Sequence, residues 1–200
     1  MSVKFKTVVN RLPDVGKTVS LLNGRKVEVG VLKGEHAWLA GIHEYGCTIR
    51  AQNAKYLTVP CSPKAVGKSA RDFPDLWTFT SKSGEKFLCR DTGPKTFECL
   101  CWLTTEVVIP ERAFLRNGHD ANIDDVMKRA ERAVGQLIAG RMDVQTFLDL
   151  IGQTLSGKIE TFARNLSDPP NSPITAENKG SNNPLVDTGN MIGSISWSTN

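Results

Sequence analysis

The sequence predicts an α+β fold in which a small antiparallel or mixed sheet packs against two long amphipathic helices, with extended loops or arms. Two observations support this prediction: a β-rich stretch over residues 47–108, and apolar residues at helical spacing over residues 122–162. With 200 residues and a hydrophobic fraction of 40%, the chain is long enough to bury a core as a single domain, residues 1–200.

The two helices follow each other closely in the sequence. Asn122 and the acidic residues after it are typical of a helix start, and Gly140 ends that helix. Asp143 caps a second helix, whose apolar residues recur at intervals of three and four. Gly152 and Gly157 each weaken this helix by about 1 kcal/mol relative to alanine, so we expect a neighbour to pack closely against both.

The N-terminal part contains two shorter elements. Alternating charged and apolar residues predict a strand over residues 26–32. Helical spacing predicts a short helix over residues 36–45 that turns Trp38 and Ile42 toward the core. Gly46 then ends this helix in a backbone conformation that favours glycine.

The β-rich stretch is interrupted, and the C-terminal region is irregular. Residues 62–84 are interpreted as an insertion, because prolines and glycines punctuate this polar segment. Residues 166–200 are interpreted as a loop followed by a docking arm, whose apolar side chains dock on the body or on a partner. The predicted strands within the β-rich stretch are residues 55–60, 87–90, 97–103 and 104–110.

Composition argues against several protein classes. The first residues lack the apolar stretch of a signal peptide, so we expect a protein kept in a cytosol or packed into a particle formed there. No segment approaches the roughly 18–20 apolar residues of a membrane span. The five cysteines are odd in number and their spacing does not fit a zinc site, so we expect them to be reduced.

Basic residues are concentrated near the N-terminus. Through Glu35 there are seven basic and three acidic residues, which accounts for the whole net charge of +4. A surface that faces DNA or an acidic partner would explain this excess, and so would an ordinary solvated edge.

Motifs for catalysis are incomplete. Residues 16–18 (Gly-Lys-Thr) match the end of a phosphate-binding loop, but Arg11 stands where that loop needs glycine. Residues 187–189 (Asp-Thr-Gly) match the tripeptide of aspartic proteases, whose chemistry needs two such carboxylates and hence a symmetric homodimer here. His36 and His43 are seven residues apart, which does not fit a metal-binding pair on a helix. We therefore expect no enzyme, no metal and no cofactor.

Three segments in order carry a resemblance to a known family. The first is Val-Gly-Val at 29–31 with Ile-His-Glu-Tyr-Gly at 42–46, and the second is Ile-Pro-Glu-Arg-Ala-Phe-Leu-Arg at 109–116. The third is Pro-Leu-Val-Asp-Thr-Gly-Asn-Met at 184–191. Together they resemble the neck and tail-completion (head–tail joining, virion morphogenesis) proteins of tailed bacteriophages. Two departures from the family pattern are Glu111, where a small residue is usual, and a longer stretch before residue 109.

The resemblance implies a structural virion protein of the phage neck. Such a subunit would complete the tail or join the head connector to it, as a hexamer or dodecamer around the DNA channel. Its implied partners are connector or stopper proteins, tail terminator or tail tube proteins, and packaged DNA held without sequence specificity. It would be assembled in the host cytoplasm and located in the virion. The alternative, from a different class, is a soluble nucleic-acid-binding module.

Candidate site residues follow from these segments. Plain core packing is the alternative interpretation for Phe114 and Leu115. Lys4, Lys6 and Lys17 are expected to face the DNA channel. The residues expected at subunit or partner interfaces are Tyr45, Gly46, Arg112, Phe114, Leu115, Asp187, Thr188, Gly189, Met191, Ile195 and Trp197.

Overall fold

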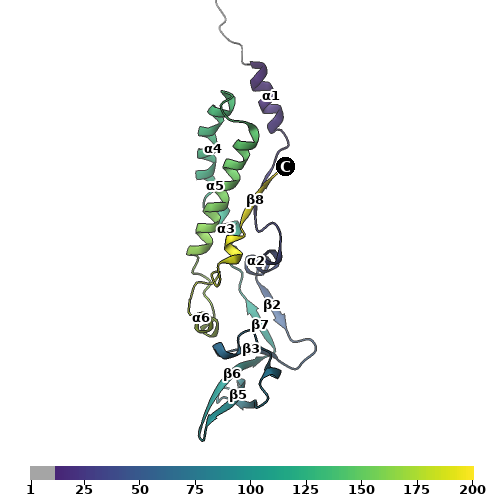
Figure 1. Ribbon diagram of the computed structural model, residues 1–200, viewed down its shortest axis with the longest axis vertical. Helices are drawn as coiled ribbons and strands as arrows, with labels where there is room; N and C mark the ends of the chain where they lie inside the picture. The colour runs from purple at the N-terminus through teal and green to yellow at the C-terminus, as the bar shows by residue number, and fades with distance from the viewer. Residues whose placement is uncertain (1–11) are drawn as a thin grey trace, which may run out of the picture.

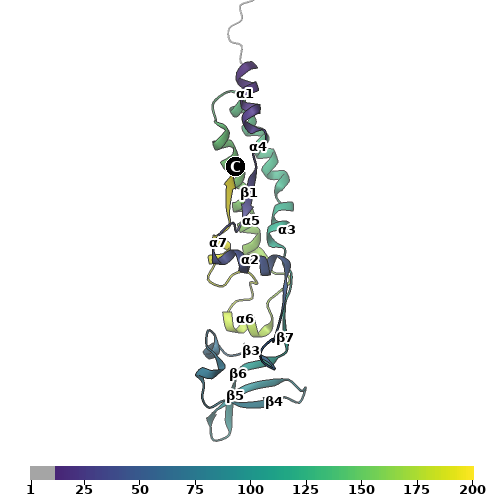
Figure 2. The same ribbon diagram turned by 90° about the vertical axis from the view of Figure 1, so that its right-hand side faces the viewer.

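The computed structural model describes residues 12–200 and shows an elongated molecule with a helical half and a β half (Figures 1 and 2). Helices make up 44% and strands 22% of the structure, so the predicted α+β class is confirmed. The helices are α1 (Leu12–Leu22), α2 (Glu35–Tyr45), α3 (Phe114–Asp120), α4 (Ile123–Ile138), α5 (Val144–Asn165), α6 (Pro173–Lys179) and α7 (Asn190–Gly193). The strands are β1 (Val27–Gly30), β2 (Cys47–Arg50), β3 (Leu57–Pro60), β4 (Trp77–Thr80), β5 (Lys86–Gly93), β6 (Thr96–Thr104), β7 (Glu106–Ile109) and β8 (Ser196–Thr199).

Helix α5 is the centre of the helical half. Asp143 caps it as predicted, because its carboxylate accepts a hydrogen bond from the backbone nitrogen of Thr146 at 2.9 Å. Helices α3 and α4 and the antiparallel β1–β8 ribbon all pack on α5. The core side chains nearest the junction with the β half are Ala40, Phe114, Val126, Leu155, Ile159, Ala163, Leu185, Met191, Ile192 and Ile195.

The β half is a four-stranded antiparallel sheet in the order β3-β6-β5-β4 at the far end of the molecule (Figure 1). Its core is small: the buried residues Ala65, Leu100 and Cys101 form one cluster, and Cys89 is buried as well. Cys89 and Cys99 face each other across β5 and β6 and form a disulfide. The expectation that all cysteines are reduced is therefore wrong for this pair, because the hairpin register brings together two cysteines ten residues apart.

The antiparallel β2–β7 ribbon connects the two halves, with Cys47 opposite Ile109. Figure 2 shows α6 beside this ribbon, between the helices and the sheet. The four-stranded sheet therefore lies apart from the two long helices, and the strands that pack on α5 are those of the β1–β8 ribbon.

Several local expectations need correction. The segment interpreted as an insertion, residues 62–84, contributes β4 to the sheet and contains the short 3-10 helices η1 (Pro63–Ala65) and η2 (Ala70–Asp72). Residues 166–200 contain helix α6, which the interpretation as a loop missed, whereas their last part docks on the body of its own chain, as one of the two expected alternatives has it. Trp38 points outward with 73% of its surface exposed, although the helical pattern predicted it inside.

The two glycines of α5 behave differently. A Cβ atom at Gly152 would lie 2.4 Å from Cδ1 of Trp197, so close packing at this glycine is confirmed. At Gly157 a Cβ atom would meet no atom within 4 Å, so close packing there is wrong.

Candidate functional site

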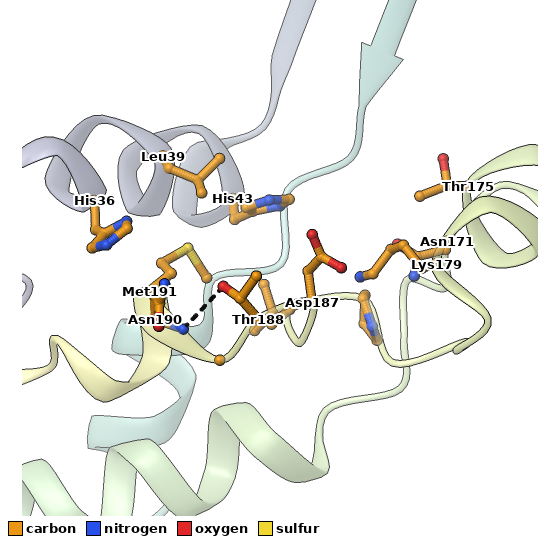
Figure 3. Close-up of a pocket in the computed structure, with 13 residues that line it drawn as sticks. His36, Leu39, His43, Asn171, Thr175, Lys179, Asp187, Thr188, Asn190 and Met191 are labelled. Carbon is orange, nitrogen blue, oxygen red and sulfur yellow. Dashed lines mark hydrogen bonds between the residues drawn. The ribbon is translucent and has the colours of Figure 1, made fainter. Parts of the chain in front are cut away.

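The junction of the two halves brings together all three segments that carry the family resemblance. The end of α2 contacts the chain between β7 and α3, and the segment after α6 closes over the same region (Figure 3). Residues from these segments come from positions more than 60 residues apart in the sequence. We treat this junction as the candidate functional site.

Glu44 organises the junction from inside. Its side chain is buried, with 3% exposure, at the end of α2. Its carboxylate accepts hydrogen bonds from the backbone nitrogens of Leu115 at 2.8 Å and Arg116 at 3.1 Å. These two donors belong to the first turn of α3, where Ala113 has a left-handed backbone and provides no side-chain cap. Glu44 therefore caps α3 from another helix and places a negative charge at its N-terminus.

Gly46 allows the two chain segments to approach closely. Its φ of 73° lies in the region that favours glycine, as predicted. A Cβ atom at this position would lie 2.8 Å from the backbone nitrogen of Glu111 and 3.0 Å from the carbonyl oxygen of Ile109. A larger residue would therefore separate α2 from the segment that leads into α3.

Arg116 connects the buried carboxylate to the surface. Its guanidinium donates to Glu44 at 2.8 Å and to Glu111 at 2.7 Å. The same guanidinium lies 4.8 Å from the centre of the Tyr45 ring. Tyr45 is 68% exposed, so this cation–π contact holds an aromatic side chain in place at the surface.

Arg112 is a buried cation without a carboxylate partner among the described residues. Its guanidinium donates to the carbonyl oxygens of Pro169 at 3.2 Å and Pro170 at 3.4 Å, and contacts Nδ1 of His43 at 2.9 Å. Burial lowers the pKa of Arg112. Burial, together with the charges of Arg112 and Lys179, lowers the pKa of His43 from 6.5 to about 4. His43 is therefore neutral at physiological pH and can accept the hydrogen bond from Arg112.

The Asp-Thr-Gly segment forms one wall of a cavity of about 280 Å³ (Figure 3). Gly189, with a φ of 82°, is the N-cap residue that precedes α7. Asp187 is the only carboxylate among the described residues that line this cavity. His36, His43 and Lys179 also line it. The pair of carboxylates that an aspartic protease needs is therefore not formed within one chain.

The remaining predicted interface residues are mostly internal. Phe114 is fully buried and Leu115 is partly buried against the same core, so the core-packing alternative holds for both. Met191 and Ile195 are also buried, and Trp197 packs on α5. In this structure the C-terminal arm therefore docks on the body of its own chain, which is one of the two expected alternatives, and a contact of these residues with another subunit stays a prediction.

The surface of α2 contains a feature that the sequence prediction missed. Trp38 and Tyr45 are both exposed, and their spacing of seven residues places them on the same side of α2. The exposed side of α2 is thus its aromatic side, whereas Ala40 and Glu44 face inward.

A wider groove lies between the sheet and α6. Its volume is about 970 Å³, and its wall includes Phe87, Trp102, Val107 and Ile174. The sequence did not predict this groove, because its walls come from segments that are distant in the chain.

Of the three lysines expected to face DNA, one lies in the part of the chain that the structure describes. Lys17 is exposed on α1, whereas Lys4 and Lys6 lie outside the described residues. Within residues 12–200, no helix combines the length and apolar character required to cross a membrane.

Comparisons with other proteins give no match. Neither a protein-family model, nor a curated protein sequence, nor a solved structure is significantly similar to this chain.

Proposed function

We propose that this protein is a structural subunit of the tailed-phage neck, which completes the tail or joins the head connector to it. It acts as a cyclic oligomer, a hexamer or a dodecamer, around the DNA channel and has no catalytic step. Its partners are connector or stopper proteins on one side and tail terminator or tail tube proteins on the other.

The observation that carries this proposal is the convergence of the three resembling segments on one junction. Glu44 caps α3, and Gly46 lets the chain around Glu111 approach α2 closely. Arg112 holds the chain that leads to the third segment, through the carbonyl groups of Pro169 and Pro170. All three motifs thus contribute contacts to the same junction, which supports interpreting them together as the signature of one fold.

The exposed apolar residues favour an assembly subunit. Trp38 and Tyr45 are exposed on α2, Val19 and Leu21 on α1, and Met127 on α4. Large apolar side chains on separate faces suit head-to-tail contacts, in which each subunit offers different surfaces to its two neighbours and the ring closes.

The test is assembly, measured in solution and in particles. Light scattering and negative-stain images of the purified protein should show rings. A phage lacking the protein should accumulate separate heads and tails. The variant Trp38→Ala should weaken ring formation, whereas Val66→Ala, which shortens an exposed apolar side chain on the β half, should not.

One outcome would overturn the proposal. A protein that stays monomeric, is absent from particles and is not needed for head–tail joining is not a neck subunit. Binding of nucleic acid by that monomer would favour the nucleic-acid-binding module instead.

A further inference from the structure

A basic hollow lies between α4 and α5 in the helical half, away from the junction. Its volume is about 340 Å³. We call it the α4–α5 hollow and define it by its lining residues, which are four basic residues, one acidic residue and a threonine. These residues are Asp125, Lys128, Arg129, Arg132, Thr154 and Lys158.

The lining of the α4–α5 hollow carries more positive than negative charge, and Asp125 is its one carboxylate among the described residues. The carboxylate of Asp125 is already engaged by Lys158, whose Nζ lies 2.6 Å from Oδ2. Lys128, Arg129 and Arg132 form no ion pair with any residue in the described part of the chain. All three residues are exposed.

The spacing of the charges on α4 is mixed. Lys128 and Arg132 are four residues apart, and like charges at this spacing repel each other by a few tenths of a kcal/mol, whereas Asp124 with Lys128 and Asp125 with Arg129 are attractive pairs at the same spacing. Asp124 and Glu131, also on α4, do not line the hollow. An anionic partner that bridges the cations would remove this repulsion.

We propose that the α4–α5 hollow binds the phosphate backbone of double-stranded DNA. Three exposed cations over about one turn of α4 suit several phosphates along a strand better than one enclosed ion. No aromatic residue is among the described residues that line the hollow, so the stacking platform typical of single-strand binding is missing there. The chemistry is that of backbone contact without base readout.

The inference rests on the proposed function only for the identity of this duplex, which would be the DNA in the neck channel. On this proposal the DNA-facing surface is the α4–α5 hollow, not the surface around Lys17 that the sequence suggested. Lys17 lies on α1, whereas the hollow is formed by the two long helices. The side of the α4–α5 hairpin that carries Lys128 and Arg132 would then face the channel.

The test compares two variants of the full-length protein with equal charge changes. The first variant is Lys128→Gln, Arg129→Gln and Arg132→Gln. The control is Lys33→Gln, Lys82→Gln and Lys95→Gln, which neutralises three exposed lysines outside the hollow. Fluorescence anisotropy measures the affinity for a labelled 30-base-pair duplex at several salt concentrations between about 50 and 200 mM.

We expect the first variant to lose more than about tenfold in affinity at 100 mM salt. We also expect its slope of log affinity against log salt to become shallower by about 2.7, because each lost phosphate contact contributes about 0.9. The control variant should retain most of the affinity. Equal losses in the two variants, or an unchanged slope in the first, would overturn the proposal.

Two further measurements are needed. One distinguishes binding of DNA from binding of free phosphate, and the other distinguishes the DNA-binding proposal from the neck proposal. Inorganic phosphate should not compete with the duplex when its total phosphate is matched to that of the DNA, and effective competition would overturn the polymer assignment. Light scattering and particle incorporation are measured on the same samples. If the wild type binds the duplex through the hollow but never enters particles, the neck assignment fails while the hollow remains a DNA-binding surface.

Discussion

The two halves of this protein are stabilised in different ways. In the helical half, α5 is covered by α3, α4 and the β1–β8 ribbon, and most of the buried apolar side chains of the molecule lie there. In the β half, the core cluster consists of Ala65, Leu100 and Cys101, and Cys89 is buried as well. The helical half is therefore stabilised mainly by burial of apolar surface.

The β half compensates through contacts between its strands. Cys89 and Cys99 form a disulfide across β5 and β6. Glu98 forms ion pairs at 2.7 Å with both Lys64 and Arg90, one of which joins the hairpin to the segment carrying η1. Damage to packing should therefore affect mainly the helical half, and loss of cross-strand contacts mainly the β half.

The largest effect is expected from overfilling the helical half. The variant Gly152→Val places a side chain where Cγ of Trp197 would lie 2.5 Å from the new Cβ atom. Because the indole must leave its site, we expect the free energy of unfolding to fall by about 3 kcal/mol. Denaturant titration measures the loss, and hydrogen exchange should place it in α5 and the β1–β8 ribbon.

Gly157→Ala is the matched control on the same helix. A Cβ atom at Gly157 meets no neighbour within 4 Å, so alanine should increase stability by about 0.4–1 kcal/mol through its helix propensity. Equal effects of the two substitutions would contradict the role assigned to close packing at Trp197.

Gly152 and Gly157 also show the limit of what could be predicted from the sequence. The apolar spacing of α5 and the cap at Asp143 were sufficient to predict the helix. The sequence could not distinguish Gly152 from Gly157, because the atom that crowds Gly152 comes from Trp197, 45 positions further along the chain.

Helix α3 was missed for a similar reason. Its start lacks a local signal, because Ala113 provides no side-chain cap. The cap comes from Glu44, which lies 71 residues before Leu115. The same contact explains why Trp38 is exposed. Because the side of α2 that carries Glu44 packs inward to cap α3, the opposite, aromatic side of α2 faces solvent.

A smaller effect is expected from the disulfide of the β half. The variant Cys89→Ser, Cys99→Ser removes a covalent link that closes a loop of ten residues. From the entropy of loop closure we expect a loss of about 2–3 kcal/mol. Hydrogen exchange under oxidising conditions should show faster exchange in β5 and β6 and little change in α4 and α5. Equal changes in both halves would mean that they unfold as one unit.

A smaller destabilisation than that of the disulfide variant is expected at the junction, and it depends on pH. The pKa of His43 is about 4 in the folded protein, below its ordinary value of 6.5. Between these values the unfolded chain binds a proton that the folded chain excludes, so the free energy of unfolding falls as the pH drops from 6.5 to 4. We expect this fall to be about 1–2 kcal/mol, because the site is only partly shielded from solvent.

Two histidine variants test that expectation through unfolding titrations at several pH values. His43→Asn retains a polar group near Arg112 but cannot be protonated, so its stability should depend less on pH between 6.5 and 4 than that of the wild type. His119→Asn, which changes an exposed histidine on α3, is the control for a histidine substitution outside the junction. If His43→Asn shows the same pH dependence as the wild type, the titrating group lies elsewhere. Excluding the proton at His43 keeps its ring neutral, which allows the buried Arg112 cation to lie beside it without repulsion.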